Sequence, residues 1–216
     1  MTEQPGPRAT PLALFEQFGG IDIYLFDQLL RGRIAPGMRV LDAGCGQGRN
    51  LVYLLRAGYE VWAVDEDPRA VATVRALAAQ LAPALPGDHF RAEPLEALSI
   101  PDGSMDVTIC SAVLHFARDT AHFEAMMQGV WRTLAPGGLL FCRVASSAGL
   151  ESRIVPTAGG RHRLPDGSER YLASEASLVE LTERLGGTLL DPIKSTIVQD
   201  QRCMATWVVR APDRLR

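Results

Sequence analysis

The 216-residue chain lacks several features that would define a class of function by themselves. Its four cysteines include no CxxC pair, and its four histidines are not spaced as metal ligands. We therefore expect reduced thiols, no disulfide framework and no metal site. These residues are Cys45, Cys110, Cys142, Cys203, His89, His115, His122 and His162.

Charge and hydropathy argue against two kinds of partner. The chain has 22 Lys and Arg against 25 Asp and Glu, a net charge of -3, so we expect no general basic surface for nucleic acid. No apolar stretch approaches the roughly 18 residues that span a bilayer, and residues 1–11 contain no apolar core of a secretory signal. We expect a cytoplasmic protein that binds neither nucleic acid nor membrane.

What the chain does contain is typical of a globular α/β protein, with 47% hydrophobic and 22% charged residues. We expect a flexible, proline-rich tail over residues 1–11 and a single domain over 12–216. Short apolar segments alternate with segments of helical periodicity, which predicts βαβ units and a parallel sheet. The predicted strands are 39–43, 61–64, 89–92, 106–110, 139–144, 189–193 and 203–209. The predicted helices are 12–18, 21–30, 50–57, 67–79, 121–134 and 175–185.

Residues 146–173 interrupt this alternation with Gly, Pro, Ser and basic residues that show little periodicity. We interpret this segment as a lid or an insertion. Arginine forks suit carboxylate or oxyanion ligands, which favours an acidic small molecule. A solvated loop that also contains Glu151, Asp166 and Glu169 is the alternative. The basic residues are Arg153, Arg161, His162, Arg163 and Arg170.

A glycine-rich turn follows the first predicted strand, over residues 42–48. Glycines at such a turn let the backbone bend tightly and let a ligand approach main-chain atoms. The spacing is Gly44-x-Gly46-x-Gly48, which differs from the GxGxxG of dinucleotide-binding folds. Asp65 ends the second predicted strand, where an acid can accept hydrogen bonds from two ribose hydroxyls. The pattern predicts a nucleotide-like ligand.

Four segments in this order resemble the class I S-adenosylmethionine-dependent methyltransferases. They are residues 40–48 (VLDAGCGQG), 61–65 (VWAVD), 101–107 (PDGSMDV) and 134–140 (LAPGGLL), and together they cover roughly residues 35–145. The resemblance implies a Rossmann-like, mostly parallel seven-stranded sheet with helices on both faces and an antiparallel last strand. A narrower likeness, in residues 46–50 (GQGRN), Leu54 and residues 58–61 (GYEV), is to the tellurite-resistance methyltransferases and their small-molecule relatives.

The resemblance also implies a role for individual residues toward S-adenosylmethionine. Asp42 would orient the loop and reach the methionine ammonium, Gly44 and Gly46 would pass under the methionine and ribose, and Asp65 would hold the ribose diol. An acid after the third strand would meet the adenine amino group; Glu93 is the best match and Glu96 is its competitor. Further implied contacts are Cys45, Gly48, Asn50, Glu66, Leu95, Cys110 and Ser111.

The chemistry itself requires little of the protein. Methyl transfer to a nucleophile needs alignment, and a base only where the acceptor must lose a proton. His115 is our candidate base or acceptor contact, and Arg143 is a candidate for steering an anion; a packed histidine and an arginine paired with an acid are the alternatives. Residues 110–113 lack the (D/N/S)PP(Y/F) motif of enzymes that methylate base amino groups.

We therefore expect methyl transfer from S-adenosylmethionine to a small-molecule acceptor, with an anionic acceptor among the options. An NAD-type oxidoreductase of similar fold and a non-catalytic S-adenosylmethionine-binding protein remain as alternatives.

Overall fold

The structure, a computed structural model, describes residues 11–213. One eight-stranded sheet forms the centre of the molecule, in the order β10-β11-β5-β4-β1-β2-β3, with β9 paired to β11. The strands are β1 (Arg39–Ala43), β2 (Glu60–Asp65), β3 (Phe90–Ala92), β4 (Met105–Ser111), β5 (Leu134–Ala145), β9 (Thr188–Leu189), β10 (Lys194–Val198) and β11 (Arg202–Arg210). Five of them, β3, β2, β1, β4 and β5, are parallel, and β11 is antiparallel to β5. This arrangement confirms the expected mostly parallel sheet with an antiparallel last strand.

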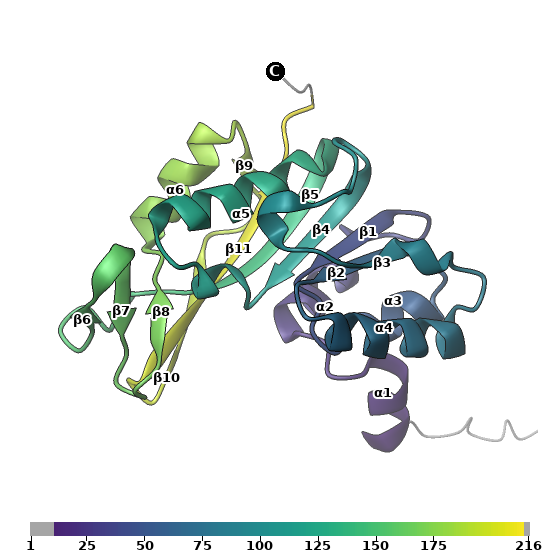
Figure 1. The fold of residues 1–216 in the computed structure, drawn as a ribbon, viewed down its shortest axis with the longest axis horizontal. Coiled ribbons are helices and arrows are strands. Elements are labelled where there is room, and N and C mark those ends of the chain that lie inside the picture. Colours follow the sequence, from purple (N-terminus) through teal and green to yellow (C-terminus); the bar gives the residue numbers. More distant parts are fainter. Residues whose placement is uncertain (1–10, 214–216) are drawn as a thin grey trace, which may run out of the picture.

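Helices cover both faces of the sheet (Figure 1). One face is buried by α2 (Ile23–Leu30), α3 (Val52–Arg56) and α4 (Pro68–Leu81), whose apolar residues join a core with β1 and β2. The other face is buried by α5 (Thr120–Arg132) and α6 (Glu175–Arg184). A further helix, α1 (Pro11–Phe18), packs on α3, where the Phe18 and Tyr53 rings stack at 5.2 Å. The expected tail at residues 1–10 lies outside the described residues, and Pro11 already begins α1.

Several predicted boundaries differ from the structure, most of all those of the strand 189–193. The predicted strand 189–193 is reduced to Thr188–Leu189, and the strand that pairs with β11 is Lys194–Val198. Pro192 has no amide proton for a ladder, and the following segment is an edge strand with polar side chains. The predicted helix 121–134 ends at Arg132, because β5 already begins at Leu134.

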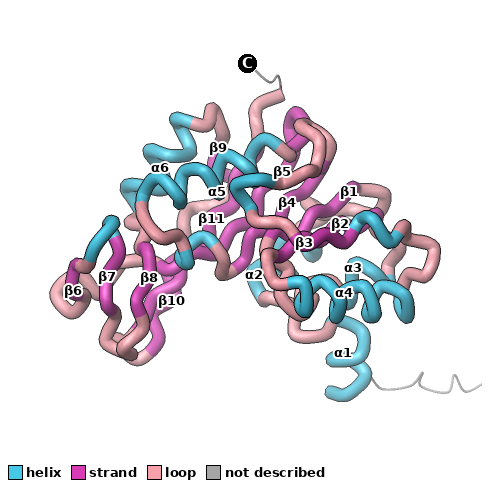
Figure 2. The backbone as a smooth tube through the Cα atoms, viewed as in Figure 1, coloured by secondary structure: helices cyan, strands magenta, loops and turns pink. Residues whose placement is uncertain are grey.

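Residues 146–173 form a small antiparallel sheet of their own (Figure 2). Its strands are β6 (Val155–Pro156), β7 (Arg161–Arg163) and β8 (Glu169–Tyr171). The Tyr171 ring stacks on Phe123 of α5 at 4.6 Å, and the Arg170 guanidinium lies 4.9 Å from the Phe116 ring centroid. The segment therefore rests on residues that follow β4. The structure also contains short 3-10 turns at Gly87–His89, Leu95–Ala97, Leu114–Phe116 and Ala158–Gly160.

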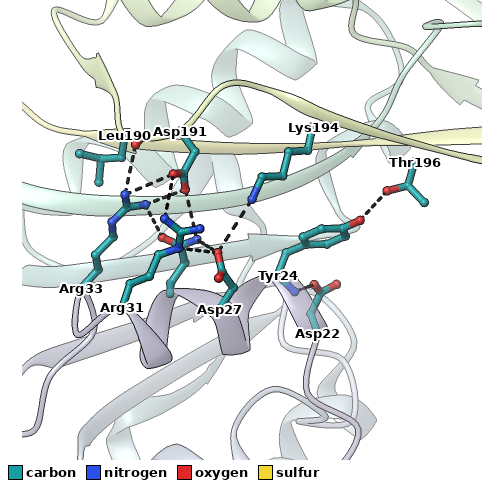
Figure 3. A network of polar contacts seen from close by, with 10 residues as sticks. Asp22, Tyr24, Asp27, Arg31, Arg33, Leu190, Asp191, Lys194 and Thr196 are labelled. Carbon is teal, nitrogen blue, oxygen red and sulfur yellow. Dashed lines mark hydrogen bonds and ion pairs between the residues drawn. The ribbon is translucent and has the colours of Figure 1, made fainter.

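A network of polar contacts joins α2 and the residues just after it to Asp191 and to β10 (Figure 3). Arg33 donates to both oxygens of Asp191, at 2.6 and 3.2 Å. The Tyr24 and Thr196 hydroxyls lie 2.9 Å apart. These contacts fix α2 against the far end of the sheet, next to the site described below. Within residues 11–213, no helix has the length and apolarity that crossing a membrane requires.

Candidate functional site

The glycine loop lies where the carboxyl ends of β1, β2 and β4 meet, the edge at which open α/β sheets bind ligands. The amides of Gly44 and Cys45 both donate to the Val64 carbonyl, which holds the loop against β2. Gly44 has φ +83° and a Cβ there would collide with Val113. Gly46 has φ +51°, and a Cβ there would meet no protein atom within 4 Å. The loop therefore leaves open space above its backbone, as the glycine pattern predicts.

That space is part of a cavity of about 740 Å³. Nine of the residues implied by the resemblance line it: Gly44, Cys45, Gly46, Asn50, Asp65, Glu66, Glu93, Leu95 and Ser111. Glu96, the competitor of Glu93, lines the cavity as well. The lining residues that the sequence did not predict are Gln47, Arg49, Pro94, Ala112, Val113, Phe116, Arg118, His122 and Met126. Asp42, Gly48 and Cys110 are not on its wall.

Asp42 lies beneath the glycine loop with only 1% of its surface exposed. Its Oδ2 atom is buried and has no hydrogen-bond partner among the described residues. Burial raises the pKa of Asp42 to about 7, which nearby Arg49 opposes and Asp65 reinforces. A buried carboxylate oxygen without a donor is costly, so this atom fits a cationic donor supplied by a ligand.

The carboxylate of Asp65 connects the glycine loop to the start of α4. Its Oδ2 accepts from the Gly46 amide at 2.8 Å and its Oδ1 accepts from the Asp67 amide at 3.0 Å. Each oxygen retains a lone pair that can accept from a ligand hydroxyl. Because Asp65 also lines the cavity, its position agrees with the ribose-binding role that the resemblance implies.

Two acids compete at the end of β3, as expected. The Glu93 carboxylate accepts from the amide and the hydroxyl of Ser99, the amide contact at 2.7 Å. The Glu96 carboxylate lies 3.0 Å from His122 Nε2. His122 Nδ1 accepts from the Arg118 amide, so its proton is on Nε2 and points to Glu96. Both acids line the cavity, and each is oriented by a protein donor.

His115, the candidate base, is not on the wall of this cavity. Its ring is buried against Phe116, and its Nδ1 accepts from the Ala145 amide at 3.3 Å. Burial lowers the pKa of His115 to about 4, and the positive charge of neighbouring Arg170 acts in the same direction. This geometry is that of a histidine packed in the protein interior, the alternative to a catalytic base. A catalytic role for His115 stays an untested prediction.

Arg143, the candidate for steering an anion, is also absent from the wall and pairs with an acid instead. Its Nη1 donates to Asp22 Oδ2 at 2.7 Å, and its guanidinium lies over the Tyr24 ring. Asp22 is buried in turn beside Arg49, which does line the cavity. The sequence did not predict Arg49 as a charged contact, although Arg49 directly follows the glycine-rich turn at residues 42–48.

Cys110 of β4 and Cys142 of β5 contact each other, and neither lines the cavity. Cys110 pairs in register with Cys142, and both are free and buried. Ser111, one residue further, reaches the cavity and accepts from Arg49 Nη2 at 3.3 Å. Within the described residues, no group of three or more His, Cys, Asp or Glu is placed to hold a metal ion.

These features define a site for a nucleotide-like ligand that carries a cation. The open glycine loop accommodates a ligand against the backbone, Asp65 can accept from a diol, and the unpartnered Asp42 oxygen can accept from an ammonium group. S-adenosylmethionine has all three complementary parts, and the residues present fit it.

Comparison with known proteins leads to the same class. Residues 41–142 match a protein family described as a methyltransferase domain. A ubiquinone biosynthesis O-methyltransferase of Methylocella silvestris is 35% identical over 117 residues, which are 52% of this chain and 43% of that protein. The chain spans less than half the length of the first curated relatives that it matches.

Two solved structures share the fold. The 1,6-didemethyltoxoflavin-N1-methyltransferase of Burkholderia thailandensis, with bound S-adenosylhomocysteine, aligns with a TM-score of 0.66 at 20% identity over 97% of this chain and 94% of that one. The [4+2]-cyclase SpnF aligns with a TM-score of 0.68 at 17% identity over 88% of this chain and 81% of that one. Residues 41–142 are thus similar to a methyltransferase domain, and the chain has the fold of a methyltransferase solved with bound S-adenosylhomocysteine.

Proposed function

We propose that the protein transfers a methyl group from S-adenosylmethionine to a small-molecule acceptor. The observation that carries this proposal is the buried, unpartnered Oδ2 of Asp42 beneath an open glycine loop, with Asp65 at the same cavity. S-adenosylmethionine, when bound, supplies an electrophilic methyl group on a sulfonium.

The chain's own residues would bind and align rather than react. Gly46 provides backbone that a ligand can approach closely, because nothing lies within 4 Å of the place of a Cβ there. Asp65 is already oriented by two amides and can hold a diol. A cavity of about 740 Å³ leaves room for an acceptor beside the cofactor. Alignment of this kind lowers the barrier of a displacement without a catalytic base.

The finer proposal is that the acceptor is anionic. Arg118 lines the cavity and has 72% of its side chain exposed. Arg170, on β8, holds its guanidinium over Phe116, which lines the same cavity. Both cations are thus placed to attract an anionic acceptor. Arg170 belongs to residues 146–173, the segment that we propose to act as a lid.

Three further expectations remain proposals. We infer a single domain over residues 12–216, a cytoplasmic location from the scattered thiols, and no binding of nucleic acid from the net charge of -3. The narrower likeness to the tellurite-resistance methyltransferases also stays a prediction.

Calorimetric titration with S-adenosylhomocysteine and with NADH tests the cofactor, and turnover tests the reaction. Radiolabelled S-adenosylmethionine would be incubated with thiol, amine, carboxylate and chalcogen oxyanion acceptors. We expect binding of S-adenosylhomocysteine but not NADH, and label transfer to a carboxylate or oxyanion acceptor in preference to its ester. Binding of NADH alone would support the oxidoreductase alternative. Binding of S-adenosylhomocysteine without transfer to any acceptor would support the non-catalytic alternative.

A further inference from the structure

A hairpin in residues 146–173 brings two basic side chains to the same face of the small sheet. Strands β7 and β8 are antiparallel, and His162 pairs directly with Arg170. Directly paired residues of antiparallel strands point to one face, and their sequence neighbours point to the other. His162 and Arg170 therefore share a face, and Arg163 lies on the opposite face with Glu169.

The face with Arg170 is turned toward the residues that follow β4. The Arg170 guanidinium lies 4.9 Å from the centroid of the Phe116 ring, a cation–π contact. After burial, the charge of Arg170 is the second cause that lowers the pKa of His115, so these two side chains are close as well. Phe116 is 56% exposed and lines the cavity. Arg170 thus lies beside the part of the cavity wall that Phe116 forms.

Neither His162 nor Arg170 has an acidic partner among the described residues. Arg170 Nη1 donates to the Glu169 carbonyl at 2.8 Å, and the guanidinium forms no ion pair within residues 11–213. Asp166, an acid within electrostatic reach of Arg170, accepts from Ser168 instead. His162 Nδ1 is buried and has no hydrogen-bond partner in the same part of the chain. Because an unpaired buried polar atom is costly, the two side chains fit an anion that supplies acceptor oxygens.

The surroundings of Phe116 add an apolar surface to this charged end. Val113, Phe116 and Met126 all line the cavity. Arg118 lines it too, but its guanidinium lies 3.9 Å from Glu96 and its side chain is 72% exposed. An ion pair with so exposed a side chain contributes little. The side chains best placed to anchor an anion next to the apolar wall are therefore those of His162 and Arg170.

We propose that Arg170 and His162 bind a carboxylate of the methyl acceptor, and that the apolar body of the acceptor packs against Phe116. The acceptor is then an apolar carboxylic acid that this carboxylate anchors. A guanidinium and an imidazole side by side match the two oxygens of a carboxylate through charged hydrogen bonds. The inference rests on the proposed function and narrows it, because it assumes that the cavity holds the acceptor beside S-adenosylmethionine.

Ligand-observed NMR titration at saturating S-adenosylhomocysteine tests the proposal without turnover. Phenylacetate has a ring and a carboxylate, phenylacetamide replaces the charge with a neutral amide, and acetate lacks the ring. We expect the wild type to bind phenylacetate about tenfold or more tightly than either of the others, because one loses the charged hydrogen bonds and the other the apolar contact.

Substitutions on the two faces of the small sheet then separate local binding from general charge. Arg170→Met should reduce the preference for phenylacetate over phenylacetamide to about twofold or less, with the affinity for S-adenosylhomocysteine unchanged. His162→Leu should reduce this preference by a smaller factor, and His162→Asn, whose amide can donate, should restore part of it.

Arg163→Met is the matched control, because it removes an exposed positive charge from the same strand on the opposite face. It should keep the wild-type preference. A melting curve of each variant shows that it is folded. Because the preference is a ratio of two affinities, a general loss of structure would not change it selectively.

Equal affinities of the wild type for phenylacetate and phenylacetamide would overturn the proposal. So would a preference that survives in Arg170→Met, or one that Arg170→Met and Arg163→Met reduce equally. Failure of the wild type to bind S-adenosylhomocysteine would contradict the proposed function together with this inference. Binding of S-adenosylhomocysteine without any preference among the three small ligands would contradict this inference alone.

Discussion

Asp65 has two functions that a single substitution can separate. It fixes Gly46 through a hydrogen bond of 2.8 Å, and it faces the cavity where a ribose diol is expected. We predict that Asp65→Ala weakens binding of S-adenosylhomocysteine tenfold or more, because a charged hydrogen bond contributes about 1.5–3 kcal/mol. Isothermal titration measures the change.

Asp67→Ala is the control for this substitution. Asp67 caps α4 by accepting from the Arg69 amide, and its side chain is 41% exposed. The control should lower the free energy of unfolding slightly, as loss of a helix cap does, with little effect on affinity. A dissociation constant that Asp65→Ala leaves unchanged would remove the ribose assignment.

We predict that cofactor binding depends on pH because of the raised pKa of Asp42. Its pKa is raised to about 7 by burial, so below that pH most of the ligand-free protein carries a neutral Asp42. A cationic ammonium favours the ionised form, and binding therefore releases a proton. Affinity should rise with pH, by up to about tenfold per pH unit below 7, and level off above it.

Calorimetry in buffers of different ionisation enthalpy counts the released proton directly. Asp42→Asn should bind more weakly above pH 7 and show no such pH dependence. An affinity of the wild type that is constant from pH 5.5 to 8 would exclude the linkage.

Sequence alone could place Asp42 and Asp65 because both lie near the carboxyl ends of neighbouring parallel strands, where local order determines position. Arg49 was missed because its contacts depend on Asp22, 27 positions earlier in the sequence. Phe116 and His122 reach the cavity only through the way α5 and the preceding 3-10 turn pack, which periodicity does not specify. The cofactor side of the site was therefore predictable, and its opposite wall was not.

Among the secondary-structure elements, the ones that sequence predicts best are the strands whose side chains are buried on both faces of the sheet. Strands β1, β2, β4 and β5 are buried on both faces, so short apolar runs between glycines identify them. The edge strand β10 begins with three polar residues, and the strands β6, β7 and β8 have two or three residues each. Such segments are stabilised by their partners rather than by their own sequence.

We predict that the contact between Arg33 and Asp191 stabilises the fold. Arg33 donates to both oxygens of Asp191, whose side chain is only 11% exposed. Arg33→Met leaves this carboxylate poorly paired, and we expect the free energy of unfolding to fall by about 1–3 kcal/mol. Urea denaturation followed by circular dichroism measures the difference.

Arg31→Met serves as the comparison on the same network. Arg31 is 46% exposed and lies 3.7 Å from Asp191 (Figure 3). Exposed pairs contribute about 0–1 kcal/mol, so its loss should be small. Equal effects of the two substitutions would mean that burial does not distinguish the two arginines.

For the molecule as a whole, the fold indicates which cofactor can bind more closely than it indicates which reaction follows. The chain shares its architecture with a methyltransferase that binds S-adenosylhomocysteine and with a [4+2]-cyclase. One fold therefore supports different chemistry, and the acceptor is determined by what surrounds the cofactor site. In this chain, the candidates are the cavity residues Phe116 and Arg118, and Arg170 of β8, which lies over Phe116.

Two buried groups should give the stability of the ligand-free protein opposite dependences on pH. Asp42 has a folded pKa raised to about 7 from 3.8, so its contribution to stability falls as pH rises through that window. His115 has a folded pKa lowered to about 4 from 6.5, so its contribution rises as pH rises between those values. The two slopes overlap and offset each other, because each changes the free energy of unfolding by up to about 1.4 kcal/mol per pH unit.

Single substitutions should expose each slope. Asp42→Asn leaves the His115 dependence, so stability should rise from pH 4.5 to 6.5 more steeply than in the wild type. His115→Asn, whose amide oxygen can replace the Nδ1 that accepts from Ala145, leaves the Asp42 dependence, and stability should fall over the same range. Saturating S-adenosylhomocysteine should abolish that fall, because its ammonium favours ionised Asp42. Urea unfolding at several pH values measures all three slopes. A decline in His115→Asn that persists unchanged with ligand bound would show that the ammonium does not reach Asp42.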